Sequence, residues 1–599
     1  MRDQQLHDIL KGTFGYDQFR LHQKALIDTV LDGDDALGIM PTGGGKSLCY
    51  QVPALHLPGI TLVVSPLISL MNDQVVNLGE HGVEAVFLNS SQDQREAREK
   101  IRQGKVKLVY VSPEGILAPS LQTFFDQVKL SLIAIDEAHC VSQWGHEFRK
   151  DYTRLGELRE RFPNVPVVAL TATADARTRD DIAQQLRLRA PRVMVASFDR
   201  PNIRYAIQER EDEIPQLVRF IRNHHANDTG IVYCLSRDKV ERIAEALAKQ
   251  GVPAVPYHAG LSPEVRTRHQ DRFNKDERVI VVATIAFGMG IDRPDVRFVA
   301  HLDLPKSIEG YYQETGRAGR DGRPASAWML YGLSDVVKLS QMLESTEADE
   351  AYKKVARHKL DRMLALCESA SCRRLHLLRY FGEEGSACGN CDTCLEPPVL
   401  WDATVDAQKI MSTIYRTGQV FGAGHVIDVL RGAKAAKISE RGHDTLSVYG
   451  AGKDLPKEHW NSVLRQLLNL DFVAIKNWEY RSLALTERAR PVLQGHEKVH
   501  LRRQTALVAA KAPSRALKEA VPAHGRDSLF AALKELRLRL AKERGVPPYV
   551  VFPDRTLHDM CQLLPRTRDE FLLVNGVGES KVEKYGEEFL RAIAEYRNS

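Results

Sequence analysis

A glycine-rich segment at residues 40–50 (MPTGGGKSLCY) has the composition of a phosphate-binding loop. Its three consecutive glycines let the backbone turn tightly, so that successive N–H groups can point at a phosphate chain. Lys46 would then reach the β- and γ-phosphates, and the hydroxyl of Ser47 would bind Mg²⁺. The apolar stretch ALGIM leads into the segment and a helical pattern follows it, which is the context that a phosphate loop requires. The residues predicted to bind ATP and Mg²⁺ in this loop are Thr42, Gly43, Gly44, Gly45, Lys46 and Ser47.

Two adjacent carboxylates, Asp136 and Glu137, follow the apolar run LIAI (132–135) in the sequence DEAH. A strand that ends in two carboxylates suits a magnesium–nucleotide site. Asp136 would bind Mg²⁺, and Glu137 would orient or deprotonate the attacking water. The string DEAH is short and also occurs by chance. It predicts ATP hydrolysis here because a phosphate loop lies 90 residues upstream.

Two arginines, Arg317 and Arg320, lie three residues apart in the glycine-containing segment YYQETGRAGRDG (311–322). At this spacing both guanidinium groups can reach one target. In a two-lobed protein they would cross the cleft and stabilise charge on the transferred phosphoryl group, as arginine fingers do. The alternative is a solvated basic helix start, and the two motifs upstream favour the catalytic interpretation.

Four of the nine cysteines crowd into 23 positions, with the spacing C-x15-C-x2-C-x2-C. In a large protein of a reducing compartment, such clustering indicates metal rather than disulfides. Four thiolates can close a tetrahedral shell around Zn²⁺ with no open position, so we expect a structural site; an iron–sulfur cluster is the competing use. The predicted Zn²⁺ ligands are Cys372, Cys388, Cys391 and Cys394.

The elements that must position these residues are visible as apolar runs. Between about residues 25 and 335, short runs rich in β-branched residues alternate with helical patterns. Such runs predict an α/β fold, with parallel strands buried between layers of helices. This length is too great for one sheet, so we place a break near SFDRPNIRY (197–205) and predict two α/β lobes. The predicted strands are residues 61–66, 106–112, 132–137, 165–171, 230–234, 279–284 and 296–302.

The rest of the chain divides into smaller units. A helical region ends in the cysteine cluster, a helix-rich unit follows with a terminal hairpin whose second strand is RSLALT (481–486), and a linker leads to a final helical bundle. The predicted boundaries are 1–200 for the first lobe, 201–335 for the second lobe, 336–400 for the helical zinc-binding module, 401–500 for the helix-rich unit, 501–525 for the linker and 526–599 for the bundle.

The composition is ordinary for a globular protein, with 43% hydrophobic and 27% charged residues among 599. No stretch approaches the about 20 apolar residues of a membrane span, and the polar start MRDQQLHDIL is unlike a signal peptide, so we expect no membrane partner. The net charge of +5 divides unevenly, because residues 401–599 hold 32 Lys and Arg against 24 Asp and Glu. This excess predicts contact with a polyanion in the C-terminal third, and a solvated surface is the alternative.

Together these features resemble the helicases of superfamily 2, and among them the RecQ family. The resemblance implies that the two tandem parallel-sheet lobes are RecA-like. Met40 occupies a position that the general phosphate-loop pattern gives to glycine, a departure that superfamily 2 shares. FGYDQFRLHQ (14–23) resembles the family's N-terminal motif, and the resemblance implies that Tyr16, Arg20 and Gln23 hold the adenine. Further family motifs are matched by SPLISLMNDQV (65–75), TATA (171–174) and ATIAFGMGIDRPDVR (283–297).

An aromatic and basic loop, within CVSQWGHEFRKDY (140–152), follows the two carboxylates. Bases could stack on Trp144 or Phe148 while Arg149 contacts a phosphate, and each stacked base contributes about 1–3 kcal/mol. Packing of the aromatic residues in a core is the alternative. The RecQ resemblance implies that this loop couples single-strand binding to ATP hydrolysis. The predicted DNA-binding residues of the loop are Trp144, His146, Phe148 and Arg149.

The resemblance continues behind the lobes, where the cysteine cluster stands in the place of the family's zinc module. Residues 401–495 resemble the family's winged-helix domain, and a basic cluster there, including Lys434 and Lys437, suits duplex phosphates. Residues 526–599 resemble the C-terminal helical bundle known as HRDC. Tyr549 of this bundle could stack on a base, and docking to protein is the alternative role.

The resemblance implies an ATP-dependent DNA helicase that moves 3′-to-5′ on a single strand and acts in DNA repair, recombination, replication-fork maintenance and the SOS response. Its expected cofactors are ATP, Mg²⁺ and Zn²⁺. Its expected partners are single-stranded and duplex DNA, single-strand-binding protein and other repair proteins, and we expect a monomer in the cytoplasm, associated with the nucleoid. The rival hypotheses are an RNA helicase, a non-enzymatic DNA-binding scaffold with a decayed nucleotide site, and a duplex translocase that does not unwind.

Overall fold

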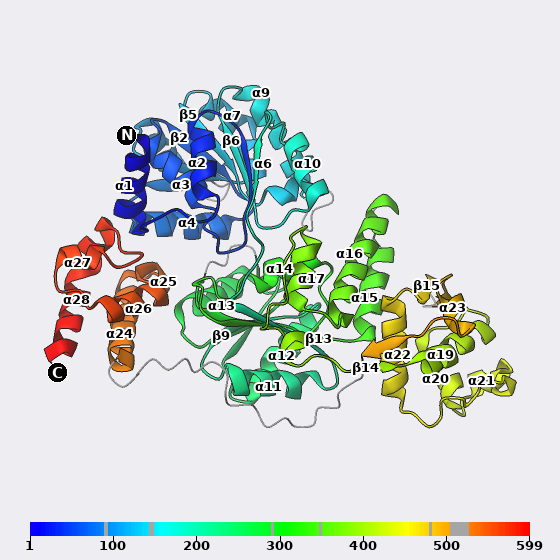
Figure 1. Cartoon of the computed structure of the whole chain (residues 1–599). Helices are drawn as coiled ribbons and strands as arrows, with labels where there is room; N and C mark the ends of the chain where they lie inside the picture. Colours follow the sequence, from blue (N-terminus) through cyan, green and yellow to red (C-terminus); the bar gives the residue numbers. More distant parts are fainter. Residues whose placement is uncertain are drawn as a thin grey trace.

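The chain folds into two α/β lobes and three smaller units (Figure 1). A helical module and a unit with a short hairpin lie beside the second lobe, whereas the C-terminal bundle lies on the opposite side. The computed structural model describes residues 1–88, 94–142, 149–288, 293–346, 350–477, 482–502 and 526–598. Within these ranges, no helix combines the length and the apolar character needed to cross a membrane.

The first lobe is a seven-stranded parallel sheet in the order β3-β4-β2-β5-β6-β1-β7. Its central strands are buried on both faces, which explains their almost continuous apolar sequences. Because all strands end at one edge, the loops after β1, β5 and β6 meet there. The strands are β1 (Ala36–Ile39), β2 (Ile60–Val64), β3 (Ala85–Leu88), β4 (Leu108–Val111), β5 (Leu130–Ile135), β6 (Val167–Thr171) and β7 (Arg192–Val195), and the helices are α1 (Arg2–Phe14), α2 (Gln23–Leu31), α3 (Leu48–His56), α4 (Ile68–Glu80), α5 (Arg95–Arg102), α6 (Pro113–Ile116), α7 (Pro119–Phe125), α8 (Lys150–Thr153), α9 (Glu157–Arg161) and α10 (Ala176–Gln185).

The second lobe is a six-stranded parallel sheet in the order β10-β11-β9-β12-β13-β8. Ser236, Ser262 and Ser307 each accept a backbone N–H at the start of a helix, which fixes where these helices begin. The strands are β8 (Ile203–Glu209), β9 (Thr229–Tyr233), β10 (Ala254–Tyr257), β11 (Ile280–Ala283), β12 (Val296–His301) and β13 (Ala325–Tyr331), and the helices are α11 (Glu213–His224), α12 (Arg237–Lys249), α13 (Pro263–Lys275) and α14 (Ile308–Thr315).

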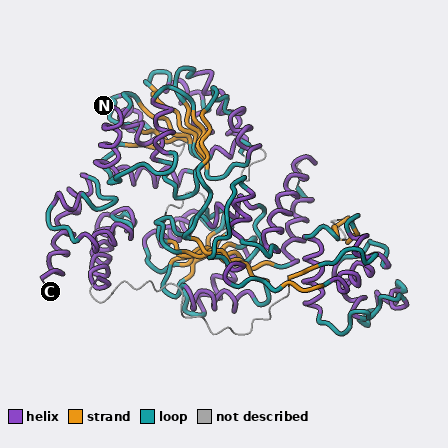
Figure 2. Tube along the Cα trace, viewed as in Figure 1, coloured by secondary structure: helices purple, strands orange, loops and turns teal. Residues whose placement is uncertain are grey.

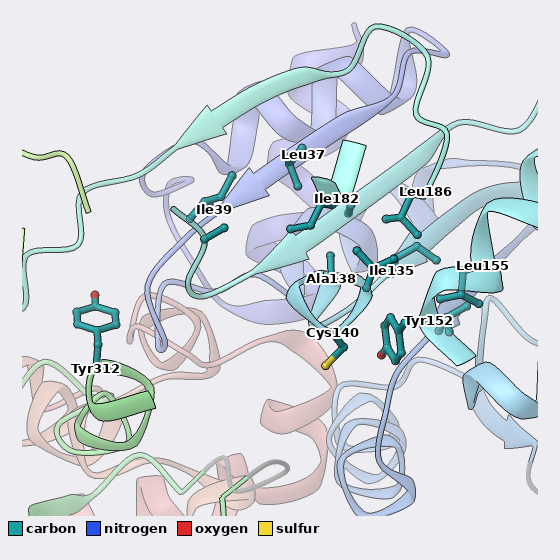
Figure 3. Close-up of a cluster of buried hydrophobic side chains, with 14 of the residues drawn as sticks. Leu37, Ile39, Ile135, Ala138, Cys140, Tyr152, Leu155, Ile182, Leu186 and Tyr312 are labelled. Carbon is teal, nitrogen blue, oxygen red and sulfur yellow. The ribbon is translucent and has the colours of Figure 1, made fainter. Parts of the chain in front are cut away.

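The hydrophobic core runs from the first sheet into the second lobe. Figure 3 shows Leu37 and Ile39 of β1 with Ile135 of β5 and Ile182 of α10, all in one buried cluster that also includes Tyr312 of α14. Each of the seven predicted strands is present, as β2, β4, β5, β6, β9, β11 and β12. The predicted fold class of two parallel-sheet lobes is confirmed, and the two sheets are joined by residues 196–202.

Two small units follow the second lobe (Figure 2). The helical module comprises α15 (Leu333–Glu344), α16 (Glu350–Glu368), α17 (Arg373–Tyr380) and α18 (Asp392–Leu395). The next unit packs its helices around the buried Trp460 and carries the predicted hairpin, in which β15 pairs antiparallel with β16. The elements of this unit are β14 (Leu400–Asp402), α19 (Thr404–Arg416), α20 (Ala423–Arg431), α21 (Ala436–Glu440), α22 (Lys457–Asn469), β15 (Val473–Asn477), β16 (Ser482–Leu485), α23 (Ala489–Leu493) and β17 (His500–Arg502).

The C-terminal bundle contacts both lobes. The N–H of Gly576 donates to the carbonyl oxygen of Gly15 at 2.8 Å, and the hydroxyl of Tyr585 donates to Glu80 at 2.6 Å. On the other side, Lys534 lies 3.2 Å from Glu277 of the second lobe. The bundle therefore bridges the lobes along one side. Its helices are α24 (Arg526–Arg544), α25 (Pro548–Val551), α26 (Asp554–Leu563), α27 (Arg568–Leu572) and α28 (Glu579–Asn598).

Candidate active site and zinc site

One cavity of about 380 Å³ brings together the residues predicted to bind and hydrolyse ATP. The phosphate loop reaches it between β1 and α3, the two carboxylates reach it after β5, and the two arginines reach it from the turn after α14 in the second lobe. The segment before α2 closes another side. The predicted residues that line the cavity are Tyr16, Arg20, Gln23, Thr42, Gly43, Gly44, Gly45, Lys46, Ser47, Asp136, Glu137, Arg317 and Arg320.

The phosphate loop needs its glycines for shape. Gly43 and Gly45 have φ angles of 81° and 76°, which residues with a side chain rarely adopt. A Cβ on Gly45 would lie 2.4 Å from Nε2 of Gln23. The Gln23 amide donates to the carbonyl oxygens of Gly44 at 3.2 Å and Gly45 at 3.0 Å, so this residue also fixes the loop backbone. Ser47 stands at the N-terminus of α3, where the positive end of the helix dipole favours an anion.

The two carboxylates are held at the sheet edge. The N–H of Asp136 donates to Val64 at the end of β2, at 2.9 Å. Glu137 has a φ of 47°, a strained conformation for a residue with a side chain, which directs it away from the strand. Nδ1 of His139 lies 2.9 Å from the hydroxyl of Thr171 and 3.4 Å from Oε2 of Glu137. His139 thus connects the candidate base to the TATA segment, a link that the sequence analysis did not predict.

The two arginines occupy different environments. Arg317 is 5% exposed, and its guanidinium donates to the carbonyl oxygen of Gly288 within its own lobe. Arg320 lies across the cleft, and its Cα is 3.5 Å from the point where a Cβ on Gly43 would stand. The second lobe therefore packs directly against the phosphate loop.

The predicted adenine end of the cavity is also walled by the C-terminal bundle. The guanidinium carbon of Arg20 lies 5.9 Å from the centre of the Tyr16 ring, so a flat base has an aromatic and a cationic surface to stack on. Burial and, after it, the nearby positive charge of Arg555 lower the pKa of Arg20. The bundle residues that line the cavity include Pro547, Tyr549, Arg555, Asn575 and Lys581.

The sequence analysis missed this wall because it placed Tyr549 on a DNA surface. Tyr549 is half-buried in the cavity lining, and its contact with DNA stays a prediction. Lys581 is 3% exposed and donates to the carbonyl oxygen of Val550 at 2.9 Å, and burial lowers its pKa to about 8. No local pattern distinguishes these residues from other surface residues of a helical bundle, so the sequence carries no signal for their position.

The four clustered cysteines meet at one point. Their sulfur atoms all lie within 4.8 Å of one another, with Cys372–Cys391 at 3.9 Å and Cys388–Cys394 at 4.0 Å. Four sulfurs at about 2.3 Å from a tetrahedral Zn²⁺ would be about 3.8 Å apart, so the donor set fits zinc. The N–H groups of Leu375 and Cys388 donate to the Cys372 sulfur at 3.4 and 3.3 Å, as expected around a thiolate.

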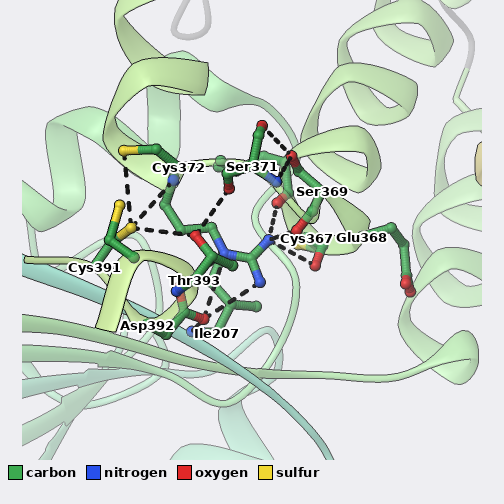
Figure 4. A network of polar contacts seen from close by, with 12 residues as sticks. Ile207, Cys367, Glu368, Ser369, Ser371, Cys372, Cys391, Asp392 and Thr393 are labelled. Atoms are coloured by element: carbon green, nitrogen blue, oxygen red, sulfur yellow. Dashed lines mark hydrogen bonds and ion pairs between the residues drawn. The ribbon is translucent and has the colours of Figure 1, made fainter. Parts of the chain in front are cut away.

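A buried ion pair ties this cysteine site to the second lobe (Figure 4). Arg373 is 1% exposed, and its Nε lies 3.0 Å from Oδ1 of Asp392. The same guanidinium donates to the carbonyl oxygens of Cys367 and Ser369, both at 3.0 Å. Oδ2 of Asp392 accepts the N–H of Ile207 in β8 at 3.0 Å. The module is therefore joined to the edge strand of the second sheet.

The structure describes some of the residues predicted to contact DNA and not others. Trp144, His146 and Phe148 lie outside the described residues. The N–H of Arg149 donates to Cys140 at 2.9 Å, and its guanidinium donates to the carbonyl oxygen of Pro66 at 3.0 Å, within the SPLISLMNDQV segment. Lys434 and Lys437 are exposed near α21, where they can reach a partner.

Two lobes that close on one nucleotide cavity define a helicase-type ATPase, and comparison with known proteins agrees. Five family models match the chain in succession: DEAD/DEAH box helicase at residues 20–182, helicase conserved C-terminal domain at 211–322, RecQ zinc-binding at 333–395, RQC domain at 397–509 and HRDC domain at 526–593.

The similarity to curated proteins extends over nearly the whole chain. The "ATP-dependent DNA helicase RecQ" of Haemophilus influenzae is 50% identical over 98% of this chain and 96% of its own length. The proteins of the same name from Pasteurella multocida and Bacillus subtilis are 49% and 39% identical, over 98% of this chain and 94% and 98% of their own lengths. The chain therefore belongs to the RecQ family of helicases.

Proposed function

We propose that the protein is an ATP-dependent DNA helicase. The observation that carries this proposal is the single cavity in which the phosphate loop and two carboxylates of the first lobe face two arginines of the second. An ATP molecule bound there would touch both lobes, so its hydrolysis would change how the lobes are held together. Alternating grip on one strand by the two lobes would then move the protein along DNA.

The residues divide the chemistry of hydrolysis among them. Lys46 would bind the β- and γ-phosphates, and Mg²⁺ held by Ser47 and Asp136 would neutralise their charge. Glu137 would position the attacking water and accept its proton. This role is supported by its buried Oε2, which receives no hydrogen bond from a described protein group.

The second lobe would supply the positive charge that the transition state needs. Arg317 and Arg320 would stabilise the transferred phosphoryl group. We assign the larger share to Arg320, because it lies against the phosphate loop. Tyr16, Arg20 and Gln23 would hold the adenine.

The units behind the lobes favour DNA as the substrate. The RecQ zinc-binding and RQC models match there, and the exposed Lys434 and Lys437 suit duplex phosphates. Arg149 and the aromatic loop before it would meet the single strand. Tyr549 lines the proposed nucleotide cavity. For Tyr549 to stack on a base of DNA, the C-terminal bundle would have to move away from the first lobe. The rate of unwinding should be compared on DNA and RNA duplexes. Faster unwinding of the RNA duplex would support an RNA helicase instead.

Several finer properties are proposed from the family alone. These are movement in the 3′-to-5′ direction, a role in DNA repair and recombination, a monomeric state, contact with single-strand-binding protein and other repair proteins, and a nucleoid-associated place in the cytoplasm. The names of the bacterial relatives support the link to DNA, and the domain boundaries given above are proposed on the same basis.

The decisive experiment is strand separation with Mg-ATP on duplexes that carry a 3′ or a 5′ single-stranded tail, with Lys46→Ala as the control. Unwinding of the 3′-tailed duplex alone, abolished in the control, supports the motor and its direction. DNA-stimulated ATPase without unwinding would identify a translocase. Absence of any ATPase would leave a DNA-binding scaffold.

A further inference from the structure

Arg200 lies in the segment that joins the two sheets and contacts both lobes at once. Its Nη1 donates to the carbonyl oxygen of Thr42 in the phosphate loop at 2.8 Å and to that of Gly316 in the second lobe at 3.1 Å. Its Nη2 donates to the carbonyl oxygens of Ala318 at 2.9 Å and Gly319 at 3.1 Å. One guanidinium therefore holds four backbone oxygens, one from the first lobe and three from the second.

The three oxygens in the second lobe border the two catalytic arginine candidates. Gly316 and Ala318 flank Arg317, and Gly319 precedes Arg320. Asn202, two residues beyond Arg200, holds the same turn, because its amide donates to Gly319 at 2.8 Å and to the carbonyl oxygen of Arg323 at 2.9 Å. The position of both arginines thus depends on side chains of the joining segment.

The turn that carries the two arginines packs tightly against the phosphate loop and against Asn202. A Cβ on Gly316 would lie 3.2 Å from Cβ of Thr42, and one on Gly319 would lie 2.4 Å from Nδ2 of Asn202. Arg200 itself is 8% exposed, so its charge is removed from water and the carbonyl dipoles are its described partners. Only a planar guanidinium presents donors in a fixed fork that can serve all four oxygens; a lysine ammonium is a single point on a flexible stem.

The helical module holds the joining segment on both sides of Arg200. The Glu383 carboxylate accepts the hydroxyl of Ser197 at 2.5 Å and the N–H of Phe198 at 2.8 Å. The Phe198 ring stacks on Phe381 with centroids 4.3 Å apart. Nη2 of Arg374 donates to the carbonyl oxygens of Pro201 and Ile203 at 3.1 and 2.9 Å. The segment is therefore fixed by tertiary contacts and is not a free linker.

We propose that Arg200 is a positioning residue for ATP hydrolysis: it locks the turn that carries Arg317 and Arg320 to the phosphate loop, and so sets the two arginines against the γ-phosphate. This inference rests on the proposed function. Arg200 lines no part of the cavity and acts through the two arginines. Breaking its contacts should impair the chemical step rather than the binding of ATP.

The test compares full-length Arg200→Ala and Arg200→Lys with the wild type in ATPase assays saturated with a single-stranded oligonucleotide. We expect kcat of Arg200→Ala to fall about 100-fold, since a displacement of about 1 Å can cost that much, while KM for ATP stays near wild type. The thermal midpoint should fall, because the substitution leaves buried carbonyl oxygens without a donor, so the assays are run well below it. Low-millimolar guanidinium ion should restore part of the lost rate. Arg204→Ala, which removes an exposed arginine from β8, is the matched control and should retain full kcat.

The alternatives give different results. Wild-type kcat in Arg200→Ala, or a loss that follows only from a lowered thermal midpoint and does not respond to guanidinium, would overturn the proposal. If the alanine variant does not fold, Arg200→Lys decides: a low kcat at a wild-type thermal midpoint supports the role of the fork, and full activity overturns it. Failure of the proposed function itself is distinct, because then the wild type would show no DNA-stimulated ATPase.

Discussion

A buried ionic network should control how firmly the unit from Leu400 to Arg502 is attached to the rest of the protein. Arg465 of α22 is 4% exposed and lies between two carboxylates. It donates to Glu368, which is 1% exposed, and to Glu209 of β8 at 2.5 Å. Its guanidinium also lies 5.2 Å from the centre of the Tyr331 ring. Three units of the chain therefore meet at this one side chain.

Replacing Arg465 by Met should destabilise this junction by about 3–5 kcal/mol, because it leaves the buried charge of Glu368 without its main partner. The remaining cation, Arg502, is 4.0 Å from Glu368 and partly compensates. The double variant Arg465→Met/Glu368→Gln removes both charges. It should therefore be less destabilised than Arg465→Met alone, although it carries one more substitution.

The readout is peptide-resolved alkylation of Cys367, which is 0% exposed and adjacent to Glu368. A loss of about 3–5 kcal/mol in the local opening free energy corresponds to labelling about 100- to 4,000-fold faster. Cys234, buried in the second lobe, is the internal control and should label at its wild-type rate. Unchanged labelling of Cys367 in Arg465→Met, or a double variant that labels faster than the single one, would refute the reasoning.

Three further predictions concern the sites themselves. Glu137→Gln should bind ATP normally but hydrolyse it about 100- to 10,000-fold more slowly, which single-turnover kinetics with a nucleotide-binding assay would show, and an unchanged hydrolysis rate would contradict. Cys391→Ser should lower the zinc content measured in the purified protein and expose the start of α17 to protease, whereas an unaltered metal content would exclude the four-cysteine site. Lys581 has a folded pKa of about 8, below about 10.4 in the unfolded chain, so the unfolded state binds more protons between these values and the stability of the C-terminal bundle should rise with pH across them. Urea-dependent proteolysis at several pH values should show this rise and its loss in Lys581→Met; a slope that survives the substitution would assign it to another group.

The sequence predicted the parts of the fold whose signal is local. The inner strands are mostly apolar because both faces of the sheet are buried there. Each predicted strand is an inner strand of one of the two sheets. The unpredicted strands include the edge strands β3, β7, β8 and β10. Their burial is partial, and β8 alternates between buried and exposed residues, so they lack a continuous apolar run.

That the candidate nucleotide residues line one cavity was predictable for a related reason. A phosphate loop, a strand ending in Asp136 and Glu137, and the arginine turn are each contiguous in sequence, and the parallel sheets bring their ends to one cavity. What remained hidden depends on packing between distant segments. Nothing in the bundle sequence shows that Tyr549 lines this cavity, and nothing near His139 shows that Thr171 will be its partner.

The joining segment, residues 196–202, combines a boundary that the sequence predicts with tertiary contacts that the sequence does not predict. The length of the α/β region placed a boundary between lobes near residues 197–205, and a boundary of this kind is ordinarily expected to be a flexible connection. The contacts of Arg200 with Thr42 and Gly319 span 158 and 119 residues, and that of Ser197 with Glu383 spans 186. Each contact alone is a single hydrogen bond, but all of them require the same placement of the phosphate loop, the arginine turn and the cysteine module. A segment held in this way cannot change conformation independently of those three sites, so any movement of the lobes must break or re-form its contacts as a group.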